Sequence, residues 1–537
     1  MSDEVRCETE EPSEADDVRR AEAASELLEG LLADVERLAA LPYALRQRLT
    51  IAAGRLSRPS PEQRTAVTRA MKKRQKKARE EASRAADESR LATTGIRRRR
   101  RAVASWQHGA IADRRGERPL LSPLAPEVAV ASEPPTEAGP RLEEARHCYI
   151  CKARYRAIHF FYDALCPDCA ALNWQKRSPR ADLSGRVALV TGARVKIGYE
   201  AALMLLRNGA RVIVTTRFPQ DAARRYRGEA DFADFASRLT IYGLDLRHVP
   251  SVETFARALE AREPSLDFLI NNACQTVRRP PGFYDHLMRE ERTPFGALDD
   301  DLRPLLADYA DLKGHLRADS TAQTGGLLRR DELSDLPGLV DPAELSQLAL
   351  LAEDRERGCF PRGALDEDEQ QVDLRERNSW RLTLAQVSAV ELLEVQLVNA
   401  VAPFILNARL KPAMQRGCRG DRHIVNVSAM EGQFGRHLKT DRHPHTNMAK
   451  AALNMMTRTS AADYLADGIH MNSVDTGWIT DEDPSLLADR KRERHGFHPP
   501  LDAVDGAARI VDPIFSGLET GRHVWGAFLK DYAPTPW

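Results

Sequence analysis

The stretch RVALVTGARVKIG, from Arg186 to Gly198, decides the fold of this chain. Its apolar run ends at Val190 and breaks into a turn that begins with Thr191 and Gly192. Gly198 follows six residues after Gly192, at the head of an apolar helical segment. A strand, a tight turn and a helix N-terminus are how a parallel sheet presents backbone N–H groups to a dinucleotide phosphate. The stretch therefore predicts a dinucleotide site, although a pair of glycines alone is also common in surface turns.

Further apolar strands follow at the spacing of a parallel sheet, and the segments between them have the length of helices. Strands that alternate with helices indicate βαβ units, which build a doubly wound parallel sheet of the α/β class. The next expected strands are Arg211–Thr215, Leu239–Leu246 and Leu266–Ile270.

Four later motifs accompany the glycine turn: NNAC (271–274), HIVNVSAMEG (423–432), TNMAK (446–450) and NSVDTGWITD (472–481). Together the five motifs resemble those of the short-chain dehydrogenase/reductase family, over about residues 183–537. The resemblance implies a Rossmann fold and an NAD(P)-dependent oxidoreductase that transfers hydride to or from a carbonyl or alcohol of a small-molecule substrate. The cofactor-binding positions that it implies are Thr191, Gly192, Arg194, Lys196, Ile197, Gly198, Arg217, Asp245, Leu246, Asn271, Asn272, Ala273, Lys450, Thr476 and Gly477.

The chain departs from the family's pattern in the cofactor motifs. Lys196 stands at the middle glycine of the family's TGxxxGxG turn, and Cys274 ends the motif that reads NNAG in the family.

The catalytic motifs are kept only in part. Thr446 stands at the tyrosine of YxxxK, and Ala429 stands at the catalytic serine, with Ser428 one residue early. Asn399 and Lys450 match the family's active-site asparagine and lysine. The catalytic candidates are Asn399, Lys450, Thr446, Ser428 and His445.

The missing tyrosine leaves three alternatives open. In the family, tyrosine exchanges a proton with the substrate oxygen, and a threonine hydroxyl is a much poorer acid than a phenol of pKa about 10. Another acid could replace it, such as His443 or His445, with a reference pKa of about 6.5, or Tyr284. Hydride transfer could instead need little acid help, or the cofactor could bind without turnover. The two histidines could also lie in a solvated loop.

The end of the second strand bears on the choice of cofactor. NAD-preferring Rossmann proteins usually place an acid there for the ribose hydroxyls. The sequence VTT ends here in Arg217, and Arg194 and Lys196 add positive charge to the phosphate turn. An arginine fork can bind the 2′-phosphate of NADP, so we expect NADP rather than NAD. The alternative is that Arg217 is an ordinary surface charge.

A second constellation, CYIC–x14–CPDC, lies upstream of the first strand. Two CxxC knuckles at about this distance are typical of a tetrahedral structural zinc site, whereas redox CxxC motifs come singly. The other cysteines, Cys7, Cys274, Cys359 and Cys418, show no pairing pattern. The predicted zinc ligands of this zinc-ribbon-like module are Cys148, Cys151, Cys166 and Cys169.

Composition limits the remaining alternatives. The chain has 537 residues, 79 basic and 79 acidic, so its length predicts two to four units and its net charge favours no partner. No signal segment is found, and no apolar run approaches 18 residues, so we expect no membrane partner. Thiolate zinc ligands fit a reducing cytoplasm.

The N-terminal part differs in character. Residues 1–16 are acidic and expected to be disordered, and an amphipathic helix is expected over 21–41, ending at Pro42. A polar helix with MKKRQKKAR is expected beyond Pro61, and Arg97–Arg101 are five consecutive arginines. Such runs can bind nucleic acid, although most are solvated faces. The predicted units are 1–105 helical, 106–145 Pro-rich linker, 146–180 zinc module and 181–537 Rossmann domain.

An insertion of about residues 278–378 separates the NNAC motif from Asn399. It leaves the carboxyl end of the fourth strand, where ligands of open α/β sheets bind. Its opening, RRPPGFYDHL, with Phe283, Tyr284 and His286, is expected to form a lid or substrate wall. Its charged middle, with the acidic run Asp366–Glu369, is expected to be a solvent-facing loop.

Two functional hypotheses remain. The first is an NADP-dependent oxidoreductase with a docked zinc module, and the retained Asn399 and Lys450 favour it. The second is a catalytically weak scaffold that binds the cofactor and recruits a protein or nucleic acid through the zinc module and basic helices. The helices that carry Asn399 and Lys450 are also expected to support a homo-oligomer.

Overall fold

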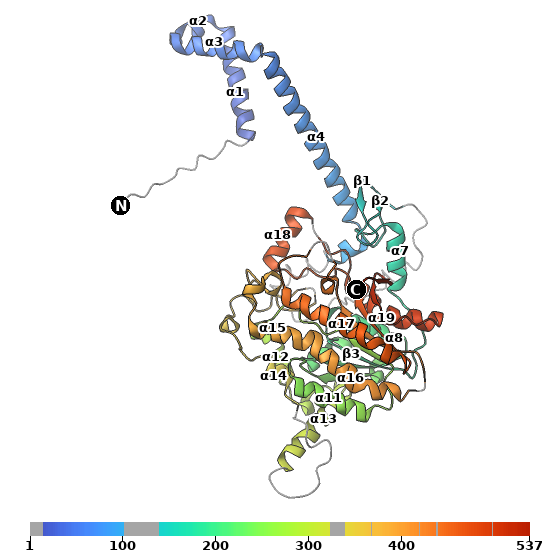
Figure 1. The fold of residues 1–537 in the computed structure, drawn as a ribbon. Coiled ribbons are helices and arrows are strands. Elements are labelled where there is room, and N and C mark those ends of the chain that lie inside the picture. The colour runs from blue at the N-terminus through green and yellow to red at the C-terminus, as the bar shows by residue number, and fades with distance from the viewer. Residues whose placement is uncertain are drawn as a thin grey trace. The chain divides into compact units, whose positions relative to one another are not determined.

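The computed structural model describes residues 14–100, 139–322, 339–366, 368–417, 419–435, 439–496 and 498–537. The chain divides into two compact units, Met1–Ala85 and Ala86–Trp537 (Figure 1). Cys7, Cys418 and most of the expected Pro-rich linker lie outside the described residues.

The larger unit is built on a sheet of eight strands in the order β10-β9-β8-β7-β6-β3-β4-β5. Every neighbouring pair is parallel except β9 and β10. The order runs outward in both directions from β3, which confirms the predicted doubly wound Rossmann fold. The strands are β3 (Val187–Thr191), β4 (Arg211–Thr216), β5 (Leu239–Gly243), β6 (Phe268–Asn271), β7 (Arg422–Ser428), β8 (Ile469–Asp475), β9 (Phe528–Lys530) and β10 (Ala533–Thr535).

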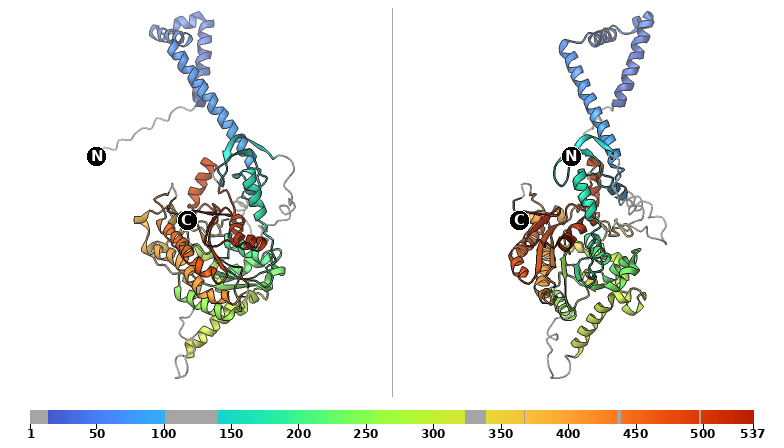
Figure 2. Two further views of the ribbon diagram at one scale, coloured as in Figure 1. Left: turned by 45° about the vertical axis from the view of Figure 1, so that its right-hand side comes forward. Right: turned by 90° about the vertical axis from the view of Figure 1, so that its right-hand side faces the viewer.

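Helices cover both faces of the sheet (Figure 2), which explains why its central strands are apolar throughout. Successive side chains of a strand point to opposite faces. Ala188 and Val190 of β3 accordingly join one hydrophobic core, and Val187 and Leu189 join the other. The first core packs against α8 (Lys196–Arg207), α9 (Pro219–Arg227) and α19 (Ala503–Thr520), and the second against α11 (Val249–Arg262), α16 (Ala402–Gln415) and α17 (Pro444–Leu465).

The helix that carries Asn399 is interrupted by a π-helical turn, Leu397–Val401, between α15 (Ala389–Gln396) and α16. The span Ala389–Gln415 is long and apolar enough to cross a membrane. Core helices of soluble proteins pass the same test, and half of its most apolar window is buried in the protein. The expectation concerned uninterrupted apolar runs, and polar residues interrupt this span at several positions. The span passes on mean hydropathy because those polar residues are few.

The described parts of the insertion fold against the Rossmann domain, contrary to the expected solvent-facing loop. Phe283, Tyr284, Leu287 and Phe360 form a small core of their own with Phe218, which follows β4. Residues 323–338 of the insertion lie outside the described part. Its elements are η2 (Pro281–Tyr284), α12 (Asp285–Glu291), η3 (Phe295–Ala297), α13 (Arg303–Ala322), α14 (Pro342–Leu345) and η4 (Ala352–Arg355).

The four-cysteine segment forms a small module of β1 (Arg141–His147), β2 (Arg154–Ala157) and α7 (Pro167–Lys176). Its core extends to Ile479 and Leu501 of the Rossmann domain. The Arg177 guanidinium donates to the carboxylates of Asp502 and Asp505 at 2.8–3.0 Å. Because these carboxylates lie at the start of α19, the module is docked on the domain.

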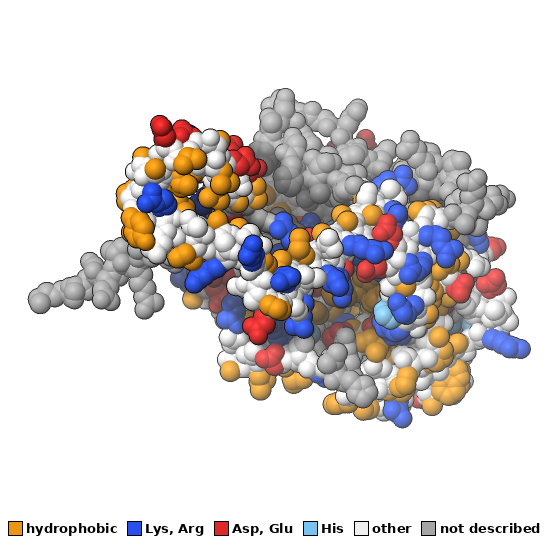
Figure 3. Space-filling view, turned by 90° about the horizontal axis from the view of Figure 1, so that it is seen from above, with side chains coloured by type: hydrophobic (Ala, Val, Ile, Leu, Met, Phe, Trp, Pro, Cys, Tyr) orange, Lys and Arg blue, Asp and Glu red, His pale blue; other side chains and the backbone are white. Residues whose placement is uncertain are grey.

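The N-terminal unit holds α1 (Glu14–Ala33), α2 (Val35–Ala40), α3 (Tyr43–Ser57) and most of α4 (Pro61–Leu91). The single helix expected over 21–41 is two helices, because the Asp34 carboxylate accepts from the amides of Glu36 and Arg37 and starts a new helix. On α1, Leu31 is buried, whereas Leu27 and Leu32 are exposed. Apolar side chains cover much of these helices in Figure 3.

The remaining short elements connect these layers. They are α10 (Phe232–Phe235), η1 (Ala236–Arg238), η5 (Ser379–Arg381), η6 (Leu384–Gln386), η8 (Met430–Gly432) and α18 (Ser485–His495).

Candidate cofactor and active site

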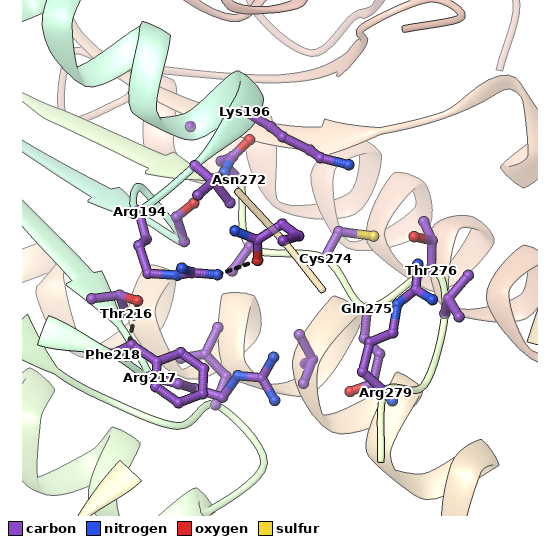
Figure 4. Close-up of a pocket in the computed structure, with 18 of the residues that line it drawn as sticks. Arg194, Lys196, Thr216, Arg217, Phe218, Asn272, Cys274, Gln275, Thr276 and Arg279 are labelled. Carbon is purple, nitrogen blue, oxygen red and sulfur yellow. Dashed lines mark hydrogen bonds between the residues drawn. The ribbon is translucent and has the colours of Figure 1, made fainter. Parts of the chain in front are cut away.

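A cavity of about 380 Å³ opens at the carboxyl ends of β3 to β6, at the point where the strand order reverses (Figure 4). This is where open α/β sheets bind their ligands. The phosphate turn, the end of β4 and the segment after β6 form its walls, together with residues of the insertion. Of the sequence-predicted cofactor residues, those that line it are Gly192, Arg194, Lys196, Ile197, Gly198, Arg217, Asp245, Leu246, Asn272 and Ala273.

The turn between β3 and α8 is braced by the NNA segment after β6. The Asn272 side chain donates to the carbonyls of Thr191 and Gly192 at 3.0 and 3.2 Å. The Ala273 amide donates to Thr191 Oγ1 at 3.0 Å. Gly192 has φ +67°, and a Cβ there would lie 2.8 Å from the Ala273 Cα. A Cβ on Gly198 would lie 2.2 Å from Asn272 Nδ2. Both positions therefore require glycine, because the segment after β6 and the turn itself come too close to leave room for a Cβ.

Lys196 takes the left-handed conformation for which the family keeps a glycine, with φ +56°. It is the first residue of α8, and no side chain caps the amides of that helix. Its ammonium lies 3.5 Å from the carboxylate of Asp368, in the insertion. Burial would lower the pKa of Lys196, but the carboxylates of Asp368, Glu482 and Asp366 raise it above its usual value. The acidic run of the insertion thus faces the phosphate turn.

Arg194 is engaged within the protein. Its guanidinium donates to Asp221 at 2.6 Å and to the side chain of Gln370. Burial lowers the pKa of Arg194 despite the Asp221 carboxylate, which opposes that effect. This arginine therefore ties the insertion to the turn rather than adding a free positive charge.

Arg217, at the end of β4, points into the cavity (Figure 4). Its guanidinium donates to the hydroxyl of Tyr284 at 2.5 Å and lies 4.6 Å from the centre of that ring. The cavity's other arginines, Arg194, Arg247 and Arg279, form ion pairs. Within the described residues, Arg217 is the arginine of the cavity that makes none.

The opening of the insertion is a wall of the cofactor cavity, at the β4 end of the sheet. Phe283 and Tyr284 line the cavity beside Arg217. The opening was expected to form a substrate wall, and it forms a wall of the cofactor cavity instead. His286 does not line it. Tyr284 was a candidate acid, but its hydroxyl is bound to Arg217, beside the strand that contacts the adenosine half in Rossmann folds.

Two predicted cofactor residues are held by other side chains. Asp245 accepts from Arg247, which also pairs with Glu394 at 3.0 Å. Asn271 donates to Asn407 and Asn426, each at 2.8 Å, and its carboxamide thereby joins β6 to α16 and β7. Asn271 is thus a structural residue of the sheet.

Asn399 supports the floor of the site from the π-helical turn. Its side chain accepts from the Gln275 amide at 2.7 Å and donates to the Gln275 carbonyl at 3.1 Å. Gln275 lines the cavity, whereas Asn399 does not. The extra residue of the π-helical turn orients Asn399 toward the segment after β6.

Ser428 is the last residue of β7, Thr446 and Lys450 lie in the first two turns of α17, and all three are buried. The Lys450 ammonium donates to the Val427 carbonyl at 2.7 Å. The hydroxyls of Ser428 and Thr446 have no hydrogen-bond partner among the described residues. None of the three lines the cavity. Unpaired buried hydroxyls are costly, so these two side chains are suited to binding a polar ligand or water.

His445, the residue before Thr446 in α17, forms a buried pair with a carboxylate. His445 Nε2 lies 3.4 Å from Glu391 Oε1. Burial would raise the pKa of Glu391, but the side chains of His445 and Ser379 lower it below its usual value. Glu391 was missed in the sequence, because it lies outside the family's motifs, eight residues before Asn399. The helical spacing of Glu391 and Glu394 on an otherwise apolar stretch was the available signal.

His443 is held differently from His445. Its ring stacks on Trp380, with centroids 3.9 Å apart, and burial lowers its pKa. A lowered pKa keeps the imidazole neutral near pH 7, so His443 is a poor proton donor. The two histidines do not lie in a solvated loop, because both are buried. The segment just after the insertion contacts them, and the His443 amide donates to the Leu382 carbonyl.

The segment after β8 contacts both the cavity and the cysteine module. Gly477 has φ +81°, and its amide donates to Asp475 at 2.8 Å. The cavity is lined by Ile479 and Thr480, which sequence reasoning missed, and not by Thr476 or Gly477. The Trp478 amide donates to the hydroxyl of Tyr149, which lies between the first two cysteines.

The four predicted cysteines converge. Sulfur atoms of Cys148, Cys151, Cys166 and Cys169 all lie within 4.8 Å of one another. The Lys152 amide donates to the Cys148 carbonyl, with Lys152 at φ +63°, which forms a tight knuckle. Cys166 precedes Pro167 at the start of α7. Four sulfurs at these separations fit a zinc-ribbon-like module.

The fold and the braced phosphate turn define a Rossmann protein of the dinucleotide-binding class. Two family models match the chain: short chain dehydrogenase over residues 186–289, and enoyl-(acyl carrier protein) reductase over 378–498. An uncharacterized protein, R665, of Acanthamoeba polyphaga mimivirus is 31% identical over 402 residues, 72% of this chain and 74% of that protein. The chain belongs to the short-chain dehydrogenase/reductase family, whose members are oxidoreductases.

Other relatives match over shorter stretches. Dehydrogenase/reductase SDR family member 13 of Bos taurus is 41% identical over 109 residues, 19% of this chain and 27% of that protein. Retinol dehydrogenase 12 of Bos taurus is 37% identical over 112 residues, 20% and 34% of the two chains. The chain thus spans about a third or less of these two relatives. The solved structure of NADPH-bound carbonyl reductase from chicken fatty liver is 18% identical, with a TM-score of 0.39, covering 66% of this chain and all of that one.

Lys196 offers a test of the phosphate turn. Both Lys196→Gly and Lys196→Ala remove the ammonium, but only alanine keeps a Cβ at φ +56°. Because a left-handed non-glycine residue costs roughly 1–2 kcal/mol, we expect the glycine variant to have the larger free energy of unfolding by about 1 kcal/mol. Urea unfolding measures both variants. An alanine variant as stable as the glycine variant would contradict the left-handed backbone.

Proposed function

We propose that the protein is an NADP(H)-dependent oxidoreductase that transfers hydride to or from a carbonyl or alcohol of a small molecule. The observation that carries this proposal is the cavity at the switch point, bounded by the uncapped N-terminus of α8 and by Lys196 and Arg217. An uncapped helix N-terminus and nearby cations favour phosphate groups.

Arg217 supports NADP over NAD. The end of β4 offers no carboxylate for the ribose hydroxyls, and Arg217 is free of ion pairs within the described residues. Its hydrogen bond and stacking contact with Tyr284 hold the guanidinium toward the cavity. A guanidinium so placed can bind a 2′-phosphate through two N–H groups.

The insertion occupies the place where we expect the cofactor phosphates to bind. A dinucleotide phosphate near Lys196 would compete with the Asp368 carboxylate for the same ammonium. Gln370 and Arg194 hold this part of the insertion against the turn. We therefore propose that the cofactor displaces the Asp366–Gln370 segment from Lys196 when it enters.

The nicotinamide, when bound, supplies or accepts the hydride. The protein's own part is to move a proton to or from the substrate oxygen, a task that Thr446 cannot perform as a phenol would. We propose His445 as the proton donor, with the Glu391 carboxylate 3.4 Å from Nε2 as the charge that faces its ring. Neither ring nitrogen of His445 has a hydrogen-bond partner among the described residues. The buried hydroxyls of Ser428 and Thr446 would hold the substrate oxygen. Lys450 would bind the ribose hydroxyls in place of the Val427 carbonyl.

Partners follow from the surfaces. Exposed apolar side chains, among them Leu393, Phe404, Met448 and Met455, lie on the helices that carry Asn399 and Lys450. We propose that these helices form the contact of a homo-oligomer. A nucleic-acid partner gains no support from the arginine run, because Arg97, Arg99 and Arg100 bind groups of this chain: Arg97 pairs with Glu88 and Asp163, Arg99 with Asp502, and Arg100 donates to backbone carbonyls.

The primary test is cofactor binding and turnover by the full chain. We expect NADPH to bind more tightly than NADH by fluorescence titration, and NADPH oxidation with at least one member of a carbonyl panel.

Arg217→Asp should weaken NADPH binding by about 1.5–3 kcal/mol, the value of a charge-assisted hydrogen bond, and favour NADH in relative terms. Arg224→Asp, on α9 outside the cavity, is the control. Unchanged relative affinities would remove Arg217 from the site, and no binding of either cofactor would refute the proposal. Binding without turnover would favour a scaffold.

The proton donor is tested separately from the cofactor. His445→Gln should reduce turnover by about 10²–10⁴-fold, the usual contribution of acid–base catalysis, and leave NADPH affinity unchanged. Glu391→Gln should reduce turnover less and alter the pH–rate profile, because it leaves the imidazole in place. His443→Gln is the matched control on the same segment. Equal turnover in wild type and His445→Gln would assign the proton to another group.

We also propose that the four cysteines bind zinc and that the protein works in a reducing compartment, the cytoplasm. Cys166→Ser should lose one zinc equivalent per chain in elemental analysis, with loss of structure in the module, because structural zinc supplies the folding free energy of such modules. Cys359→Ser, outside the module, is the control. A Cys148–Cys151 disulfide in metal-free wild type would point instead to redox chemistry.

A further inference from the structure

Three histidines meet at the edge of the sheet opposite the cofactor cavity. His423 and His470 are the second residues of β7 and β8, where they are register partners, and His523 follows α19. His423 and His470 are buried, and His523 is half-buried. One ring nitrogen from each histidine lies within 4.8 Å of the others. The cluster is independent of the proposed enzyme activity.

The ring nitrogens are oriented toward one another. His423 Nε2 lies 2.9 Å from His523 Nδ1. His470 Nδ1 lies 3.2 Å from the Arg422 carbonyl, so a proton on Nδ1 leaves the Nε2 lone pair free. A histidine that donates one N–H to a backbone carbonyl while its other nitrogen binds a metal is the usual arrangement of metal-ligating imidazoles.

The carboxylate nearest in sequence does not compete for the three imidazoles. Asp421 precedes His423 by two residues, but both its oxygens accept from the Arg186 guanidinium, at 2.6 and 2.5 Å. The ring nitrogens of the cluster are therefore left to one another and to a metal.

Gly517 of α19 makes room for the cluster. A Cβ at this position would lie 2.4 Å from His523 Nδ1 and 3.3 Å from His423 Nε2. The loop that carries His523 is fixed to β8, because the Asn472 side chain donates to the Val524 carbonyl at 2.6 Å and Gly526 donates to the Met471 carbonyl at 2.8 Å. The three imidazoles are thus held in place by the sheet.

We infer that His423, His470 and His523 bind a divalent transition metal, with Zn²⁺ as the fitting ion. Three imidazoles are a known ligand set for zinc, and at a Zn–N distance of about 2.0–2.1 Å they leave the fourth tetrahedral position to water. The metal would replace the contact between His423 and His523 and join β7, β8 and the connection from α19 to β9. It would do so at the N-terminal ends of the strands, away from the cavity.

Zinc stoichiometry tests this site in the full chain. After zinc titration and gel filtration, we expect two zinc ions per wild-type chain by elemental analysis, one in the cysteines and one in the histidines. His523→Gln should retain one, and the cobalt-substituted variant should keep its sulfur-to-metal absorption. His286→Gln, a half-buried histidine outside the cluster, should retain two. Two zinc ions in His523→Gln, or one in wild type, would overturn the site in favour of a hydrogen-bonded histidine cluster.

A measurement on wild type keeps the test decisive if His523→Gln does not fold. X-ray absorption at the zinc edge should show nitrogen ligands together with sulfur in the fully loaded protein. Zinc with sulfur ligands alone would overturn the inference without any variant.

Discussion

The close approach of the end of β6 to the turn between β3 and α8 is the contact on which the cofactor site depends. Asn272 holds two carbonyls of the turn, and the Ala273 amide holds Thr191. Backbone atoms come so near that side chains at Gly192 and Gly198 have no room. As a result, the N-terminus of α8 faces the cavity with its amides uncapped. The family's middle glycine is dispensable by comparison, since Lys196 adopts its conformation at a modest energetic cost.

The insertion turns this open edge into an enclosed one. The insertion begins after β6, at the edge that binds ligands, and ends before α15. Its two ends meet, because the Arg278 amide donates to the Ser379 hydroxyl at 2.7 Å. Its path therefore crosses the site, which explains why Phe283, Asp366 and Gln370 line the cavity. The balance of charge is unusual for a phosphate site, because carboxylates stand beside Lys196 before any ligand enters. Near the catalytic segment, Trp380 and Leu382 cover His443 in the same way.

The docking of the cysteine module rests on a few buried charges. Asp505 is fully buried, the side chains of Arg177 and Asp502 are 8% and 16% exposed, and the guanidinium spans both carboxylates. Loss of one member of a buried pair costs about 3–5 kcal/mol, whereas exposed pairs contribute about 0–1 kcal/mol. The many surface ion pairs of the domain thus matter less than this one group. Through Tyr149 the same module reaches the segment after β8, so its folding is linked to a wall of the cofactor site.

The sequence by itself determined the fold, the order of the motifs and the cysteine ligand set. These follow from local rules: continuous apolar runs, turn glycines and the spacing of cysteines act within one element or between neighbouring ones. The sequence also located the cavity, because ligands of such sheets bind at the carboxyl ends of the strands.

Tertiary structure decided the partners of each side chain. Glu391 beside His445, Asp368 beside Lys196 and the meeting of His423, His470 and His523 join residues whose spacing follows no period. The partner of Arg194 was also decided by tertiary structure. The sequence predicts Arg194 as a phosphate ligand, and in the structure it binds Asp221. Contacts of this kind depend on how distant segments pack, and packing is set by the whole core rather than by any local pattern.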